Sequence, residues 1–211
     1  MLESSKEWHV QVISAEADRA LRELKQTPLL SAFYLAGGTG LALHVGHRRS
    51  MDLDFFSQEP FDADTVVSKL RFSPGFRVLG KGEATLHAQI RGTKVSFLGY
   101  PYPLLFRSAP FSEVMVADPR DIACMKISAI AGRGTRRDFI DLYAVAKLYG
   151  LPQLVEWFKE KFRPANYSVV HLLKSVTYFE EAEQDPMPDM LVPMTWEEVK
   201  GFFAAEAPKL L

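Results

Sequence analysis

The sequence predicts an α+β fold, in which a mixed sheet with helices at residues 1–110 is followed by a helical C-terminal part at residues 111–211. Strand-like and helix-like patterns alternate in the first half. Three short strand-like segments near the middle of the chain are separated by glycine-containing turns, which favours an antiparallel meander. In the second half apolar residues recur at three- and four-residue steps, as they do in amphipathic helices.

The first half begins with a predicted helix over residues 6–26, where apolar residues face one side and Pro28 ends the pattern. Residues 33–56 then change pattern twice. The run FYLA meets a pair of glycines, the helical segment LALHVGH follows, and MDLDFF alternates as a strand does. We therefore expect a strand, a tight turn, a short helix and a second strand.

A turn at residues 57–64 leads into a short helix through Val66 and Leu70, with Asp62 or Asp64 as its N-cap. Three strands at residues 76–83, 85–92 and 93–100 form the meander.

The second half is predicted to be helical throughout. The proline- and aromatic-rich residues 100–111 form an ordered connection across the surface, and Asp118-Pro119 begins a helix that Gly132 and Gly134 interrupt. Further helices are expected at residues 135–149, 152–162, 168–183 and 195–206. The acidic, proline- and methionine-containing residues 180–194 are interpreted as a surface connection.

Composition excludes several classes of protein. The chain has 211 residues, 47% of them hydrophobic, and 25 Lys and Arg balance 26 Asp and Glu, so any phosphate binding must come from a local site. A single cysteine, Cys124, excludes an intrachain disulfide framework. No signal-peptide pattern and no apolar run near the roughly 20 residues that cross a bilayer are present. We expect a soluble cytoplasmic protein without a membrane partner.

The first candidate site is Gly37-Gly38-Thr39, between a predicted strand and a predicted helix. Paired glycines let a backbone approach a phosphate closely, and the helix start supplies unpaired N–H groups. The alternative is a turn without a ligand. The spacing fits neither the P-loop nor the dinucleotide-binding glycine pattern.

The second candidate is Asp52 with Asp54. Residues two apart in a strand project from the same face, so the two carboxylates lie side by side and repel each other. A divalent cation relieves that repulsion, and oxygen ligands select Mg²⁺ or Mn²⁺. The alternative is a solvated acidic edge. A phosphate-binding turn closely followed by an acidic pair is a minimal site for a nucleoside triphosphate (NTP) with its metal.

The run FYLAGGTGLALHVGHRRSMDLDFF, residues 33–56, resembles the signature of nucleotidyltransferase-fold proteins of the AbiEii/AbiGii toxin family, within the DNA polymerase β-like superfamily. Gly37-Gly38-Thr39 and Asp52-x-Asp54 match the superfamily pattern, and Arg48-x-Ser50-x-Asp52-x-Asp54 matches that of the toxins. The resemblance implies a nucleotidyltransferase-like core. It implies nucleotide binding by Gly37, Gly38, Thr39, Arg48 and Ser50.

Two later elements extend the resemblance to residue 143. Lys126 matches the family's helix lysine, and Asp138 with Asp141 matches its Arg-x-x-Asp-like element. The resemblance implies that Lys126 contacts phosphate and that Asp138 orients Lys126 or helps to activate the acceptor. From the residues alone, the commoner situation for a lysine such as Lys126 is that its stem covers apolar surface, and Asp138 is equally a residue that complements a helix dipole. The role of Asp141 stays open.

The region near Gly132 and Gly134 also carries a basic cluster, Arg133, Arg136 and Arg137. These side chains suit nucleotide or RNA phosphates, or form a solvated helix start.

Other candidates favour ordinary structural roles. Polymerase β-like enzymes commonly add a third carboxylate from a later strand, where this sequence has Ser96, so the site holds one metal ion more securely than two. His44 and His47 are interpreted as packing or capping residues, since no cysteine or third histidine accompanies them, and Cys124 as buried and inert. The aromatic residues Tyr100, Tyr102 and Phe106 are assigned to packing rather than to base stacking.

The resemblance predicts a Mg²⁺- or Mn²⁺-dependent nucleotidyltransferase. It would transfer a nucleoside monophosphate from an NTP to an acceptor, with a tRNA 3′ end as one acceptor, as the toxin of a toxin–antitoxin pair with a cognate antitoxin. The helical C-terminal part is expected to close over a site with Asp52, Asp54, Lys126 and Asp138 as catalytic residues. The alternatives are a protein-modifying nucleotidyltransferase and a non-catalytic nucleotide- or partner-binding protein with the same fold. Base preference and oligomeric state lie outside the sequence.

Overall fold

A computed structural model describes residues 7–165 and 167–210. Its sheet has seven strands in the order β3-β4-β5-β2-β1-β7-β6. Strands β1 and β7 are parallel, as are β2 and β5, while the remaining neighbours are antiparallel. The predicted mixed sheet and α+β class are therefore confirmed. The strands are β1 Tyr34–Leu35, β2 Leu53–Ser57, β3 Arg77–Gly82, β4 Thr85–Ile90, β5 Thr93–Gly99, β6 Ala109–Phe111 and β7 Val114–Val116.

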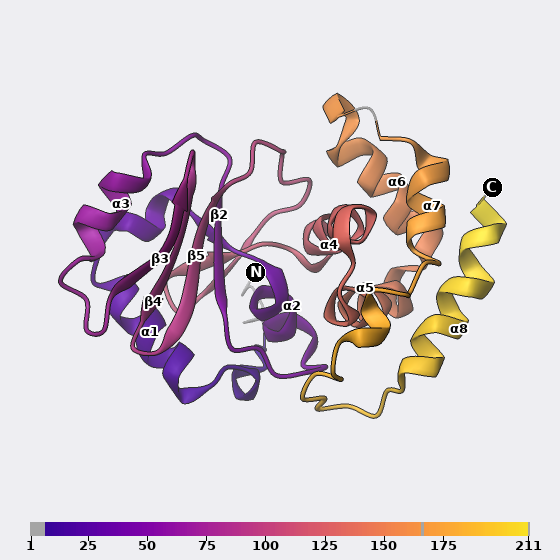
Figure 1. Cartoon of the computed structure of the whole chain (residues 1–211), viewed down its shortest axis with the longest axis horizontal. Coiled ribbons are helices and arrows are strands. Elements are labelled where there is room, and N and C mark those ends of the chain that lie inside the picture. The colour runs from indigo at the N-terminus through magenta and orange to yellow at the C-terminus, as the bar shows by residue number, and fades with distance from the viewer. Residues whose placement is uncertain (1–6, 166, 211) are drawn as a thin grey trace, which may run out of the picture.

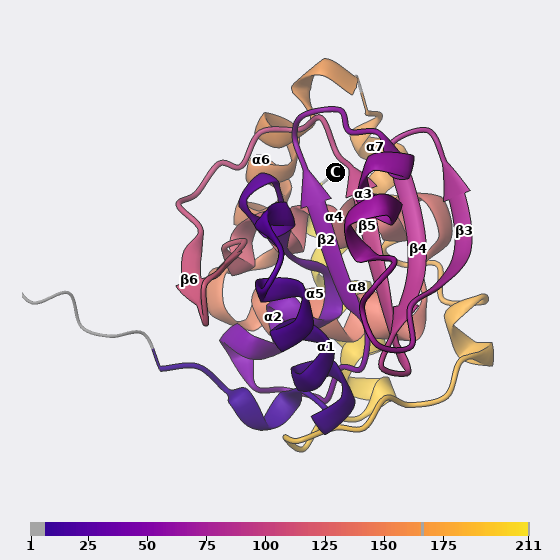
Figure 2. The same ribbon diagram turned by 90° about the vertical axis from the view of Figure 1, so that its left-hand side faces the viewer.

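Helices lie on both sides of this sheet. Figure 1 shows the sheet and the five later helices in opposite halves of the molecule, with α2 between them, and Figure 2 shows α1 and α3 over the other face of the sheet. The helices are α1 Ala15–Lys25, α2 Gly37–Val45, α3 Ala63–Leu70, α4 Pro119–Arg133, α5 Arg136–Tyr149, α6 Leu151–Lys161, α7 Val169–Ser175 and α8 Trp196–Glu206.

Two hydrophobic cores hold these layers together. One joins α1 and α3 to the sheet through residues such as Leu24, Val66 and Phe97. The other joins the C-terminal helices to one another and to the sheet, and Ile122 and Phe139 are wholly buried or nearly so within it. Helix α2 contributes to both cores, so its N-terminus is fixed between the sheet and the helical half.

Local sequence signals fix the helix starts around the site. Asp118 accepts a hydrogen bond from the backbone N–H of Arg120 and caps α4, with Pro119 at the first helical position. Thr135 and Asp138 form a reciprocal capping box at the start of α5. Over residues 33–56 the predicted strand, helix and second strand are β1, α2 and β2, while the predicted tight turn Gly37-Gly38-Thr39 is the first turn of α2. The predicted meander is β3-β4-β5.

The expectation of an all-helical second half is wrong at one place. Residues 109–116 form the hairpin β6-β7, and β7 adds to the sheet beside β1. Its strands are three residues long, and its turn places Ser112 and Glu113 at positive φ without a glycine, so neither the alternation nor the turn composition was visible in the sequence. Strand β6 spans the expected boundary between residues 1–110 and 111–211. The division of the chain into two domains stays a prediction.

Two predicted helices are shorter in the structure. Residues 6–26 contain a turn of 3-10 helix, Val10–Val12, and then α1, and Lys6 lies outside the described residues. The helix expected over residues 168–183 ends at Ser175. No helix in the described ranges is long and apolar enough to cross a membrane.

Candidate active site

The candidate active site is a cavity of about 250 Å³ where the N-terminus of α2, the start of β2 and the helical half meet. The sequence-predicted site residues other than Gly37 and Thr39 line it together, from positions up to 100 residues apart. Its lining residues are Gly38, Arg48, Ser50, Asp52, Asp54, Lys94, Lys126, Thr135, Arg137 and Asp138.

The glycine pair begins α2 directly against the site's side chains. Gly37 has φ +61°, and a Cβ atom on it would lie 2.8 Å from Oδ2 of Asp54. A Cβ atom on Gly38 would lie 2.5 Å from Nη2 of Arg48. Both contacts are closer than real Cβ atoms make, so only glycine lets the backbone approach this closely.

Thr39 and Ser50 fix the loop between α2 and β2. The Thr39 hydroxyl, which is buried, donates a hydrogen bond to the backbone carbonyl of Asp52. The backbone N–H of Ser50 donates to the carbonyl of Val12 over 2.9 Å. The proton of the Thr39 hydroxyl is thus used within the protein, while Ser50 faces the cavity.

Asp52 and Asp54 both line the cavity at the start of β2. Burial raises the pKa of Asp54, and the negative charge of Asp52 raises it further, against the lowering effects of a hydrogen bond from Ser96 and of the nearby Lys126. Ser96 lies beside Asp54 in the parallel register of β2 and β5, and its hydroxyl is 3.1 Å from Nδ1 of His87. The predicted carboxylate pair is therefore a site of unfavourable negative charge.

The aspartate pair fits a divalent cation. Within the described residues, no cluster of three His, Cys, Asp or Glu side chains that could hold a metal ion is found. Two carboxylates with the phosphate oxygens of a substrate are a usual ligand set for Mg²⁺, and a cation would offset the repulsion that acts on Asp54.

The carboxylate of Asp141 binds two cationic side chains that line the cavity, those of Arg48 and Lys126. Asp141 is fully buried on α5, and its carboxylate accepts hydrogen bonds from Nε and Nη2 of Arg48 at 2.7 and 2.8 Å. Nε2 of His47 lies 2.7 Å from Oδ1, and Nζ of Lys126 lies 2.8 Å from Oδ2. Burial alone would raise the pKa of Asp141, but Lys126 and Arg48 hold that pKa well below its usual range.

Lys126 is fixed by a second carboxylate, that of Asp138. Its Nζ donates to Oδ1 of Asp138 over 2.8 Å, while Oδ2 of Asp138 accepts from the backbone and hydroxyl of Thr135. Burial lowers the pKa of Lys126, yet the two ion pairs outweigh it and the net pKa is raised. Asp138 thus has both roles that the sequence left open, since it pairs with Lys126 and closes the capping box of α5.

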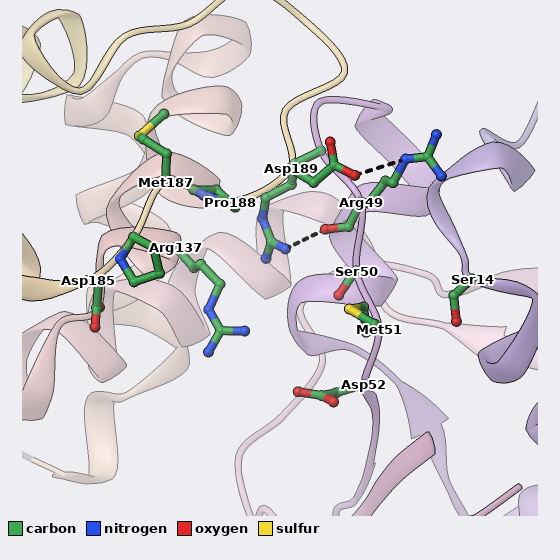
Figure 3. A pocket seen from close by; sticks show the side chains of 12 residues that line it. Ser14, Arg49, Ser50, Met51, Asp52, Arg137, Asp185, Met187, Pro188 and Asp189 are labelled. Carbon is green, nitrogen blue, oxygen red and sulfur yellow. Dashed lines mark hydrogen bonds and ion pairs between the residues drawn. The ribbon is translucent and has the colours of Figure 1, made fainter. Parts of the chain in front are cut away.

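Two cations remain available at the mouth of the cavity. Within the described part of the chain, Arg137 forms no hydrogen bond or ion pair, and Figure 3 shows its side chain extending from α5 toward Asp52. Lys94 lies on β5 and forms no ion pair with any described residue, although its charge lowers the pKa of Asp54.

A family model places this site among known proteins. The model described as "Nucleotidyl transferase AbiEii toxin, Type IV TA system" matches residues 19–209. The chain belongs to this family. It is therefore a nucleotidyltransferase of the AbiEii toxins, as the motifs predicted, and this counts against the non-catalytic alternative.

Individual proteins are also similar to this chain in sequence or in fold. An uncharacterized protein of Aquifex aeolicus is 35% identical over 205 residues, which cover 94% of this chain and 98% of the relative. Among solved structures, the nucleotidyltransferase toxin MenT4 of Mycobacterium tuberculosis has a TM-score of 0.55 and 19% identity, covering 92% of this chain and 82% of MenT4. JHP933 of Helicobacter pylori has a TM-score of 0.51 and 17% identity, covering 94% and 93% of the two chains. Both structures share the fold.

Sequence reasoning missed two features of this AbiEii-family site. Lys94 had no signal, because a lysine on an alternating strand is ordinarily solvated. The central position of Asp141 depends on side chains from three elements, so its spacing from Asp138 alone could not reveal it.

The remaining candidates have structural roles. His44 packs against Trp8 and bonds the carbonyl of Ala117, which confirms its packing interpretation, whereas His47 belongs to the Asp141 cluster. Cys124 is buried, as predicted, and burial raises the pKa of its thiol to about 12. The aromatic residues 100, 102 and 106 pack against Phe162 and Trp157.

Proposed function

We propose that this AbiEii-family protein binds the triphosphate of an NTP with Mg²⁺ or Mn²⁺ in the 250 Å³ cavity and transfers the nucleoside monophosphate to an acceptor hydroxyl, releasing pyrophosphate. One observation carries the proposal. The glycine turn, the carboxylates of Asp52 and Asp54 and the ammonium of Lys126 surround a single cavity, so they can act on a single bound triphosphate.

The glycine turn and the loop before β2 bind the phosphates in this proposal. The N–H groups at the start of α2 face the anion beside Gly37 and Gly38, and the hydroxyl of Ser50 adds a donor. Thr39 supports Asp52 through its backbone. Arg48 gives three donors to Asp141 and Arg49, and its remaining N–H groups face the cavity and the nucleotide.

Lys126 and Arg137 stabilise the negative charge that develops on the departing pyrophosphate. A metal ion held by Asp52 and Asp54 would supply neutralisation of charge on the transferred phosphate and on pyrophosphate. Lys126 needs no reorganisation to act, because two carboxylates already fix it. Since both oxygens of Asp138 accept bonds from Lys126 and Thr135, we assign Asp138 to orienting Lys126 rather than to activating the acceptor.

We further propose that the acceptor is an RNA, with a tRNA 3′ end as the specific case, and that the protein acts in the cytoplasm as a toxin restrained by an antitoxin. The family's description as the toxin of a type IV toxin–antitoxin system supports the biological part. Arg137 and Lys94, neither of which is ion-paired with a described residue, support an anionic acceptor at the mouth of the cavity.

The acceptor is identified by the molecule to which the labelled α-phosphate is transferred. The protein is incubated with Mg²⁺ and each NTP labelled at its α-phosphate, together with tRNA, with tRNA whose 3′-terminal hydroxyls are blocked, and with a protein extract. Label on intact tRNA alone is the expected result. Label on blocked tRNA moves the acceptor position elsewhere on the RNA, and label on protein replaces the RNA proposal with the protein-modifying alternative.

A further inference from the structure

A second, larger cavity adjoins the candidate active site. It measures about 550 Å³ and shares Arg48, Ser50, Asp52 and Arg137 with the smaller cavity, so the two are neighbours. Figure 3 shows it between the loop before β2 and a segment from the C-terminal half. Its volume lies within the range typical of cavities that bind small molecules.

The outer wall of this cavity is the segment 185–189, which we call the C-terminal strap. A carboxylate oxygen of Asp185 accepts a hydrogen bond from the backbone N–H of Arg136 over 3.0 Å. At the other end, the carbonyl of Asp189 accepts from the backbone N–H of Arg49 over 2.8 Å, and its carboxylate lies 3.1 Å from Nε of Arg49. The strap is therefore fixed both to α5 and to the loop before β2.

The lining of the larger cavity differs in chemistry from that of the smaller one. Met51 and Met187 are 69% and 39% exposed, which leaves apolar surface in contact with solvent. The charged groups around them balance, since Arg48, Arg49 and Arg137 face Asp52, Asp185 and Asp189. Two prolines complete the apolar wall, Pro186 and Pro188.

Such a lining suits a neutral, flat group rather than further phosphates. A triphosphate is stabilised where cationic side chains outnumber carboxylates, as in the smaller cavity, which has Arg48, Lys94, Lys126 and Arg137 against Asp52, Asp54 and Asp138. Methionine side chains adapt their shape to an aromatic ring and contact its edge favourably. An NTP joins an anionic part to a flat, neutral part, and the two adjoining cavities offer the matching pair of environments.

We infer that the larger cavity binds the base and ribose of the NTP whose phosphates lie in the smaller cavity. The C-terminal strap and the loop before β2 then both contact the nucleoside. This inference rests on the proposed function, and it makes Met187 and Met51 contact residues for the nucleoside.

The test compares each NTP with inorganic tripolyphosphate, which has the phosphates but no nucleoside. Calorimetric titrations in Mg²⁺ are made on the wild-type protein, on Met187→Trp and on Met51→Trp, each of which fills part of the cavity. Met115→Trp is the matched control, because Met115 is similarly exposed at 43% and lines neither cavity. Thermal melting is used to check that each variant is folded. If one of the two cavity variants does not fold, the other still tests the inference.

The preferred NTP should bind the wild-type protein more tightly than tripolyphosphate does. Met187→Trp should weaken NTP binding by about tenfold or more and leave tripolyphosphate binding unchanged, while Met115→Trp changes neither. Equal affinities for NTP and tripolyphosphate in every variant overturn the inference and leave the phosphate site intact. The inference is also overturned if Met187→Trp binds NTP normally but transfers less label to the acceptor at saturating NTP, because the cavity then holds the acceptor. If neither NTP nor tripolyphosphate binds the wild-type protein, the proposed function itself fails.

Discussion

Asp141 is the residue on which the arrangement of the site depends. Its carboxylate is the shared acceptor for Arg48, His47 and Lys126, and it is fully buried. Asp141→Asn leaves two buried cations without their main counter-charge, so the free energy of unfolding should fall by about 3–5 kcal/mol. Denaturant unfolding at neutral pH measures the loss. A change within experimental error would show that the cluster carries little net stability.

The depressed pKa of Asp141 sets the pH range of this effect. A carboxyl whose pKa is lower in the folded state contributes stability above its unfolded pKa of about 3.9, and this is lost as pH falls through the folded value. The stability gap between the wild-type protein and Asp141→Asn should therefore stay constant from neutral pH to about pH 5 and narrow below pH 4. A gap that widens on acidification contradicts the assignment.

Asp54 should behave in the opposite way. Burial and the charge of Asp52 raise its pKa, so its ionised form is unfavourable in the fold. In a chelator-treated protein, Asp54→Asn should raise the melting temperature, although it removes a proposed metal ligand and should abolish transfer. Added Mg²⁺ should then stabilise the wild-type protein and not this variant. A lower melting temperature without metal would contradict the charge argument.

Arg137 and Arg136 are neighbours with different surroundings, which makes them a matched pair. Arg137 extends into the cavity without an ion-pair partner in the described structure, whereas Arg136 donates to the carbonyls of Ala182 and Glu183. Arg137→Met should lower kcat by roughly a hundredfold with little loss of stability. Arg136→Met should chiefly destabilise the fold. Equal effects of the two substitutions on kcat would remove Arg137 from the mechanism.

At the scale of single residues, the sequence predicted which side chains line the site better than it predicted their partners. Asp52, Asp54 and Lys126 line the cavity, and they could be predicted as site residues because each belongs to a local pattern or matches a motif. Arg48 was predicted to bind nucleotide, but its strong bonds to Asp141 join residues 93 positions apart, and no local pattern encodes such a contact.

Among the elements, helix α5 is tied most directly to the site through its N-terminal capping box. Thr135→Ala removes the cap and should cost about 1 kcal/mol of stability. It also removes the hydroxyl hydrogen bond that holds the Asp138 carboxylate beside Lys126, while the backbone N–H bond to that carboxylate remains, so kcat should fall. The same capping box occurs at Thr195 of α8, away from the cavity. Thr195→Ala should cost similar stability without affecting kcat, and a matching loss of kcat would show that α5 acts only through stability.

The elements that the sequence predicted well are those with strong local signals. Helix α4 begins at Pro119, where Asp118-Pro119 predicted it, whereas α2 begins at Gly37, so the predicted tight turn is the first turn of the helix. The hairpin β6-β7 was missed because its short strands are stabilised by pairing with β1, which lies more than 70 residues earlier. Residues 180–194 were expected only to connect helices, yet part of this segment walls the larger cavity.

At the scale of the whole molecule, the site exists only where the sheet and the helical half meet. Gly38 and Asp52 come from the first half, and Lys126 and Arg137 come from the second. Two separate cores fix these halves, and α2 belongs to both, so the relative position of the catalytic groups follows from packing. These contacts join residues that are far apart in the sequence, so they required the structure.

The most direct test of the account measures transfer of α-phosphate label from NTP to the acceptor against Mg²⁺ concentration. The wild-type protein is compared with Asp52→Asn, Asp54→Asn and the control Thr195→Ala. We expect transfer to require the divalent cation and to fall by roughly a hundredfold or more in each aspartate variant, with no loss of folding and no change in the control. Transfer that persists in both aspartate variants, or that proceeds fully in chelator, would contradict a metal–NTP site at Asp52 and Asp54.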